Sequence, residues 1–321
     1  MKWLAGVGLV AVLVATTDET IETVYEEGQE LEVESRARSE MRLDSMELFV
    51  DDEPLPVDGD PPAGDTKADE RVFAYSDVYE EVRDGKPTRI RRSFDEISRS
   101  QESEQESSEM RGVLEGRTIL ISVDEDEEVT AEIADDEGSV DDRFLEGFRI
   151  HFTEELLLPE GSVEEGESWS VEGDELNVLL GIDPGAEFFE EDEGSDFAEV
   201  LVEAASFEAD ATYEGRDEKG GTDCWLISYE ISMDAEIDDF DPAMVGIDPE
   251  ESGFGEGALA VEGSGTGRLW IGREEKRLFA HEFEGAFEIE LSMSQSTEQF
   301  DLRMVLTMGI ELEGEKTWTT P

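Results

Sequence analysis

The stretch that decides the fold is FDLRMVLTMGIEL, residues 300–312, in which apolar side chains occupy every second position. The apolar set is Phe300, Leu302, Met304, Leu306, Met308, Ile310 and Leu312. A period of two places these side chains on one face of a β-strand and the intervening residues on the other. At about 3.3 Å per residue, such a strand would be about 40 Å long. The sequence therefore predicts a long strand that lays one face on an apolar core.

The same alternation recurs upstream and predicts hairpins. It is present in residues 119–123, 225–233 and 287–293, the last of which leads into 300–312 across a turn at 295–298. Turn residues predict two more hairpins, around Asp84-Gly85 and around Gly220-Gly221. A strand with one apolar and one polar face is typical of antiparallel sheets, so we expect few parallel pairs.

The predicted fold is mainly β, with long antiparallel strands in a strongly curved sheet or open barrel. A weak similarity between 116–133 and 267–283 leaves two related halves as an alternative to one sheet. In domain terms, we expect an N-terminal β half over 16–158, a connector over 159–195 and a C-terminal antiparallel half over 196–321.

One packed helix is predicted over residues 140–157. Phe144, Phe148 and Phe152 recur at a spacing of four, Asp141 precedes them as a cap, and Pro159 follows as a stop. These three aromatic side chains are the candidate contacts for an apolar ligand. A second short helix is expected over 174–180. The acidic, low-complexity segments 51–70, 98–109, 188–196 and 234–257 are predicted to be solvated loops.

Acidic residues dominate the composition. The chain has 88 Asp and Glu against 24 Lys and Arg, a formal net charge of -64. Such self-repulsion fits either a disordered chain or a folded protein in concentrated salt, where charges are screened. Regular apolar patterns, a single Asn, and 18 Arg against six Lys favour a folded, salt-adapted surface. Nucleic acid and anionic lipid are poor partners for so acidic a surface, because both require basic patches, and no nucleic-acid partner is expected.

The N-terminus predicts export. Met1-Lys2-Trp3 is followed by twelve uncharged, mostly apolar residues and then by acid, which is typical of a signal peptide over 1–15. The apolar run is too short for an ordinary membrane span, so we expect no integral span after cleavage and a periplasmic or extracellular protein. An uncleaved anchor or a buried strand is the alternative. The single Cys224 excludes an intramolecular disulfide.

No catalytic or cofactor-binding residue is assigned from the sequence. His151 and His281 are expected to be structural, and neither a nucleophile motif nor a phosphate-binding loop is present. For calcium, the densest group of oxygen ligands is Asp234, Glu236, Asp238, Asp239 and Asp241. The same residues could instead form a loop that holds only a diffuse ion cloud.

Residues 155–171 carry a resemblance to a known family. Leu156-Leu157-Leu158-Pro159 is followed by VEEGESWSV, residues 163–171. This arrangement resembles exported, uncharacterised bacterial β proteins, and the strand pattern is similar to the half-barrel of the LolA and LolB lipoprotein-carrier superfamily. The resemblance implies a curved antiparallel sheet around a helix, with an apolar concavity able to hold an acyl chain.

Three functions remain open at this point. The first is a non-enzymatic, exported envelope protein of salt-adapted type that binds an apolar, lipid-like ligand in the concave face of a curved sheet. The second is a calcium-binding surface or adhesion module. The third is a hydrolase with a carboxylate pair, which would require two carboxylates at a defined separation.

Overall fold

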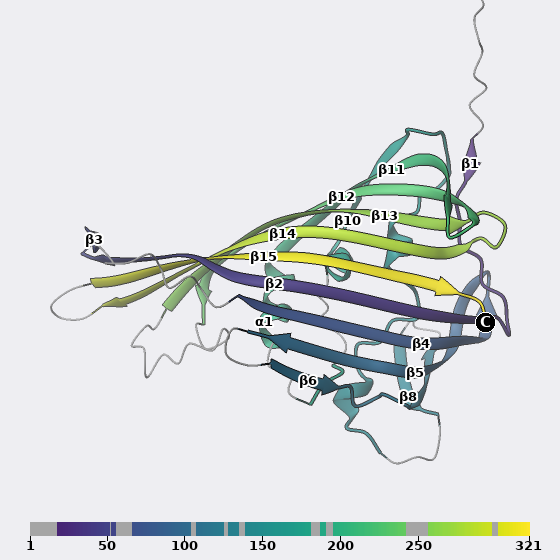
Figure 1. Cartoon of the computed structure of the whole chain (residues 1–321), viewed down its shortest axis with the longest axis horizontal. Coiled ribbons are helices and arrows are strands. Elements are labelled where there is room, and N and C mark those ends of the chain that lie inside the picture. The colour runs from purple at the N-terminus through teal and green to yellow at the C-terminus, as the bar shows by residue number, and fades with distance from the viewer. Residues whose placement is uncertain are drawn as a thin grey trace, which may run out of the picture.

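Antiparallel strands make up most of the computed structural model (Figure 1). The structure describes residues 18–51, 53–55, 66–103, 107–124, 128–134, 139–180, 187–190, 195–241, 256–296 and 301–321. The predicted signal peptide and Phe300 therefore lie outside the described residues, as do 242–255. Within these ranges, no helix is both long and apolar enough to cross a membrane.

The strands are long towards the C-terminus and shorter in the middle of the chain. Their bounds are β1 Glu19–Thr20, β2 Glu30–Val50, β3 Glu53–Leu55, β4 Lys67–Arg83, β5 Lys86–Glu102, β6 Ser107–Arg111, β7 Thr118–Val123, β8 Val129–Ile133, β9 Ser162–Val163, β10 Ser168–Glu172, β11 Ala205–Lys219, β12 Thr222–Phe240, β13 Glu256–Gly272, β14 Arg277–Ser296 and β15 Asp301–Thr319. The helices among the described residues are the 3-10 segments η1 Asp142–Leu145, η2 Thr153–Leu157 and η3 Asp174–Leu180 and the α-helix α1 Ser195–Ala204.

In the part of the chain that the structure describes, thirteen strands form one curved sheet, and β1 with β9 forms a separate pair. The main order is β10-β11-β12-β13-β14-β15-β2-β4-β5-β7-β8, with β3 beside β2 and β6 beside β5. This confirms the prediction of a mainly β, antiparallel, open curved sheet. N-terminal β2 lies beside C-terminal β15, so strands from both expected halves share this sheet (Figure 1). Strand β10, at one edge, comes from the expected connector.

The predicted hairpins are confirmed where the structure describes them. Asp84 and Gly85 both have positive φ and join β4 to β5. Gly220 and Gly221, also at positive φ, join β11 to β12. Two positive φ values in a two-residue turn match the right-handed twist of the flanking strands. Strands β14 and β15 pair from Ala280 with Thr317 as far as Ser296 with Asp301.

The predicted amphipathic helix over 140–157 is wrong. The segment contains η1 and η2, separated by extended backbone and by Gly147 at a φ of 72°. The spacing of four among the three phenylalanines arises from separate packing contacts. Phe148 lies 5.9 Å from Phe188 and 6.2 Å from Phe94, and Phe152 lies edge-on to Trp318 at 5.5 Å between ring centroids. Tertiary packing therefore overrides the local helical pattern. The helix predicted over 174–180 is present as η3.

Several predicted loops are partly strand. Strand β5 continues to Glu102 and β6 begins at Ser107, inside the expected loop 98–109. Strand β12 continues to Phe240 and β13 begins at Glu256, inside the expected loop 234–257. In these segments acidic side chains occupy only the outward positions of a strand, which lowers the overall hydropathy without breaking the sheet.

Glycines on β13 make room for aromatic rings. A Cβ atom at Gly263 would lie 1.9 Å from the Phe287 ring, and one at Gly267 would lie 2.3 Å from the Tyr229 ring. The glycine-rich segment of β13 is therefore a strand whose inner face is covered by its neighbours' rings at Gly263 and Gly267. The core continues over the concave side of the sheet, where residues from 148 to 201 pack against the strands.

Candidate functional site

The two faces of the sheet differ in charge. On β13, β14, β15 and β2, the described positions that face the core carry no Asp or Glu, while the outward positions are rich in both. Glu40, Glu284 and Glu311 are examples of outward, exposed carboxylates. The carboxylate excess of these strands is therefore on the convex side, and an anionic ligand would meet less repulsion on the concave side.

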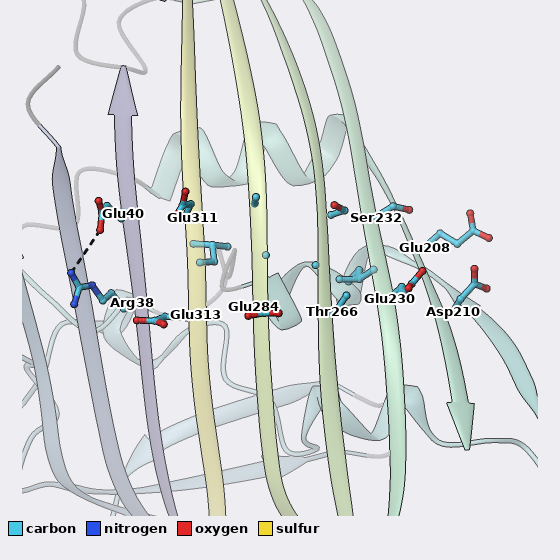
Figure 2. Close-up of a pocket in the computed structure, with 16 residues that line it drawn as sticks. Arg38, Glu40, Glu208, Asp210, Glu230, Ser232, Thr266, Glu284, Glu311 and Glu313 are labelled. Atoms are coloured by element: carbon cyan, nitrogen blue, oxygen red, sulfur yellow. Dashed lines mark ion pairs between the residues drawn. The ribbon is translucent and has the colours of Figure 1, made fainter. Parts of the chain in front are cut away.

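The outer face carries a hollow of about 970 Å³ that crosses β11 to β2 (Figure 2). Its floor is built from small residues such as Gly265, Gly285 and Ala286. Its acidic lining is Glu40, Glu208, Asp210, Glu230, Glu284, Glu311 and Glu313. Arg38 lies 3.8 Å from Glu40 there. Counter-ions would accumulate in this hollow, because seven carboxylates line it beside the apolar side chains of Ile231, Ala286 and Leu312.

The calcium candidates are spread along the end of β12. Asp234, Glu236, Asp238 and Asp239 belong to that strand, Asp241 follows it, and all five are exposed. Same-face residues of a strand are separated by about 6.6 Å, whereas calcium requires oxygens at about 2.3–2.6 Å from one point. Among the described residues, no group of three or more His, Cys, Asp or Glu is placed to hold a metal ion. The geometry therefore favours an ion cloud over a single site.

The three aromatic candidates are buried. Phe144, Phe148 and Phe152 are 4%, 7% and 8% exposed. Phe148 and Phe152 belong to the main core, while the guanidinium carbon of Arg143 lies 4.4 Å from the centre of the Phe144 ring. These side chains fill space between the strands and the segments beneath them.

A half-buried apolar surface lies elsewhere, where β15 pairs with β2. Four cross-strand pairs form it: Met304 with Leu48, Leu306 with Met46, Met308 with Leu43, and Ile310 with Met41. All eight side chains have intermediate exposure, in contrast to the closed core under β12, β13 and β14. We call this surface the Met–Leu face. The sequence predicted its β15 side, but the pairing with β2 could not be deduced from local patterns.

A buried polar cluster lies deeper in the concave side. The Tyr229 hydroxyl lies 2.7 Å from His281 Nε2, and Lys316 Nζ donates to Glu154 Oε1 at 3.0 Å. Burial lowers the pKa of His281 to about 4, so the imidazole is neutral at pH 7. Burial opposes ionisation of Glu154, but Lys316 and His281 still hold its pKa below the usual value. His281 is 4% exposed and Glu154 5%, so substrate could not reach them without opening the core.

His281 is expected from the sequence to be structural, and its buried contact with Tyr229 is consistent with that role. No local pattern identifies Lys316 and Glu154 as its neighbours. The sequence carries one signal for the buried ion pair. Lys316 is a charged residue at an inward position of β15, between Gly314 and Trp318, where the alternation predicts an apolar side chain. His151, the other histidine, is exposed.

Comparisons with known proteins give no family. No family model matches the chain, and no curated protein matches it. Similar solved structures include the outer membrane protein OprG from Pseudomonas aeruginosa, with 6% identity, coverage of 94% of this chain and 100% of that chain, and a TM-score of 0.24. An outer membrane channel from Pseudomonas putida F1 has 7% identity, coverage of 94% and 100%, and a TM-score of 0.22. A FadL homologue from Pseudomonas aeruginosa has 7% identity, coverage of 90% and 90%, and a TM-score of 0.24.

Likeness at these TM-scores carries no argument about this chain's architecture or activity. None of the three is described as a lipoprotein carrier, so the resemblance to the LolA and LolB superfamily stays a prediction.

Proposed function

We propose that this chain is a non-enzymatic, exported envelope protein of a salt-adapted cell, and that it binds an apolar, lipid-like ligand on the concave side of its curved sheet. The observation that carries the proposal is the Met–Leu face. Its eight side chains alternate inward with no carboxylate among them, yet they remain only half-buried.

Half-burial of eight large apolar residues has an energetic consequence. Complete burial of such a side chain contributes roughly 1.5–3 kcal/mol, so a face that is still partly exposed gains further free energy from an additional apolar contact. Half of the eight residues are methionines, namely Met41, Met46, Met304 and Met308. A methionine side chain is flexible and polarizable, so it adapts to ligands of varied shape. This composition favours a surface that accepts flexible hydrocarbon.

Export and salt adaptation rest on the sequence. The apolar segment at 1–15 supports a signal peptide, and the net charge of -64 supports a surface that depends on dissolved counter-ions. The outward position of the carboxylates is consistent with that role, because it leaves the concave side free of their charge.

A matched pair of variants on β15 tests the ligand site. Leu306→Gln places an amide on the Met–Leu face. Val305→Gln changes the preceding residue and places the same amide on the opposite face of the sheet. We expect a neutral fluorescent probe, N-phenylnaphthylamine, to bind about tenfold more weakly to Leu306→Gln and unchanged to Val305→Gln. Equal effects of the two variants, or no binding to the unmodified protein, would contradict the proposal. Native mass spectrometry of protein purified from its own envelope would identify the bound molecule.

A further inference from the structure

The segment 19–27, which we call the N-terminal strap, lies at the end of the sheet towards which β15 runs (Figure 1). Its first two residues form β1, which pairs with β9. Val24 then donates its backbone N–H to Lys276 O at 2.8 Å, in the turn between β13 and β14. Ile21 and Tyr25 point inward and belong to the main core. The strap therefore closes this end of the core.

On its outer side the strap is held by ion pairs at the surface. Glu19 approaches Arg216 at 2.5 Å, and Glu22 approaches Lys276 at 2.6 Å. The Arg216 side chain is 54% exposed and that of Lys276 45%, so these pairs contribute little to stability. A segment held by few backbone hydrogen bonds and by exposed side chains opens at a lower free energy than the sheet it lies on. We therefore expect the strap to open while the sheet stays folded.

On its inner side the strap is held by one carboxylate of η2. The hydroxyl groups of Thr23 and Tyr25 both donate to Glu155 Oε1, each at 2.5 Å. These donors are neutral, whereas the adjacent Glu154 is paired with Lys316. A partly buried carboxylate that is held by hydroxyl groups, and that lies beside a second carboxylate, takes up a proton more readily than an exposed one.

The charges around Glu155 act in both directions. Burial raises the pKa of Glu155, and the charge of Glu154 adds to the rise, while the two hydroxyl donors and the charge of Lys86 oppose it. The ring of Tyr79 lies 4.8 Å from that of Tyr25, and burial raises the pKa of Tyr79 well above 10, so its hydroxyl stays neutral. Opening of the strap would return Glu155 to water, where its pKa is ordinary. The closed strap therefore binds the proton more tightly than the open one.

We propose that Glu155 is a proton-operated latch, which closes the N-terminal strap over the core when the solution is acidified and loosens it when the solution is made alkaline. The sign follows from linkage, because falling pH favours the state that binds the proton more tightly. Closure strengthens as pH falls from above the raised pKa of Glu155 towards 4.5, where the open state takes up the proton as well. His281 would act in the opposite direction, because burial lowers its pKa. The latch is independent of any ligand on the Met–Leu face.

Hydrogen exchange followed by mass spectrometry measures opening of the strap in the unmodified protein. A series between about pH 7.5 and about pH 5 in concentrated KCl, with rates corrected for the intrinsic pH dependence of exchange, gives a protection factor for residues 19–27. We expect that factor to rise at least about threefold on acidification, with no such gain in β15. If strap protection does not rise as pH falls, the latch is overturned.

A matched pair of variants assigns the effect to one carboxylate. Glu155→Gln still offers an oxygen to Thr23 and Tyr25 but cannot ionise, so strap protection should be high and independent of pH. Glu22→Gln makes the same substitution on the strap and breaks the exposed pair with Lys276, so it should keep the pH dependence. An unchanged pH dependence in Glu155→Gln would overturn the latch.

A third variant tests the same carboxylate through its donor. Tyr25→Phe removes a hydroxyl that favours the ionised form of Glu155, so the pH midpoint of strap closure should rise. A midpoint that stays in place would mean that the proton binds elsewhere, and the latch would again be overturned.

Discussion

Lys316 Nζ lies 3.0 Å from Glu154 Oε1 in the interior of the protein, where it joins the last strand to the η2 segment. Glu154 is 5% exposed, and the lysine ammonium also lies 5.1 Å from the Phe152 ring centre and 5.0 Å from that of Trp318. Burial alone would favour a neutral lysine, but the charge of Glu154 raises the pKa of Lys316. The pair is therefore a buried ion pair that fixes η2 against β15.

Removing one partner of this pair should be costly. Lys316→Met leaves the Glu154 charge buried without compensation, and we expect a loss of about 3–5 kcal/mol in unfolding free energy. The double variant Glu154→Gln with Lys316→Met should recover most of it. Lys276→Met, which breaks the exposed pair with Glu22, is the control and should cost no more than about 1 kcal/mol. Denaturant titrations in concentrated KCl would give the unfolding free energies of the unmodified protein and the three variants. If Lys316→Met loses no more stability than Lys276→Met, the buried ion pair is refuted.

His281 predicts a pH dependence of stability. Its pKa falls from an ordinary 6.5 to about 4 in the folded protein, chiefly through burial, with Glu154 opposing the shift and Lys316 adding to it. The unfolded chain therefore binds the proton first, and stability is lost as pH falls from about 6.5 towards 4. Between pH 7 and 5 the loss is roughly 2 kcal/mol.

His281→Gln isolates the contribution of His281 protonation to the unfolding free energy, because an amide does not titrate. We expect the unfolding free energy of the variant to fall less than that of the unmodified protein over this interval, by roughly 2 kcal/mol. The comparison is made between pH 7 and 5 because most carboxylates remain ionised in that range. Parallel pH curves for the two proteins would show that the proton binds elsewhere.

Phe148 tests whether the concave side is closed at its centre. The side chain is 7% exposed and contacts the rings of Phe94 and Phe188, so Phe148→Ala should destabilise the protein by about 3–5 kcal/mol. Leu55→Ala, at a position 46% exposed, should change stability by less than about 0.5 kcal/mol. A small effect of Phe148→Ala, accompanied by weaker probe binding, would move the ligand site from the Met–Leu face to the phenylalanines.

The long strands were predictable because their signal is local. Alternation over 300–312 and the glycine turns at 84–85 and 220–221 each specify a strand or hairpin without reference to the rest of the chain. The 140–157 helix was mispredicted because three phenylalanines spaced by four satisfy a helical pattern that Gly147 and the packing of individual rings overrule.

The candidate site depended on pairing between distant segments, which no local pattern contains. Strand β2 meets β15 across more than 250 residues of sequence, and only that register places Met46 beside Leu306. In residues 30–50 the inward positions include Ser35, Ala37 and Ser39, and the register shifts between Leu43 and Ser45, so the apolar alternation there is interrupted on both sides of Met41 and Leu43.

Calcium binding can be tested against the ion-cloud alternative. We expect calorimetric titration in concentrated KCl to show a weak, unsaturable response, because Asp238 and its neighbours are distributed along a strand. The double variant Asp238→Asn with Asp239→Asn should then leave the titration and the melting temperature unchanged. A saturable isotherm at low stoichiometry, abolished by that variant and accompanied by a rise in melting temperature, would favour the calcium-binding module instead.

Salt dependence is the broadest consequence of the charge distribution. The outward carboxylates repel one another in the folded sheet, and the unfolded chain relieves that repulsion by expanding. Between about 0.1 and 2 M KCl the Debye length shortens from about 10 Å to below 3 Å, so salt should screen the folded state more than the unfolded one. We therefore expect the melting temperature to rise steeply over this range. Because screening of this kind depends on charge and not on the identity of the ion, NaCl should stabilise the protein to a similar extent. A melting temperature that is flat in salt would mean that the acidic surface serves some other purpose than adaptation to high ionic strength.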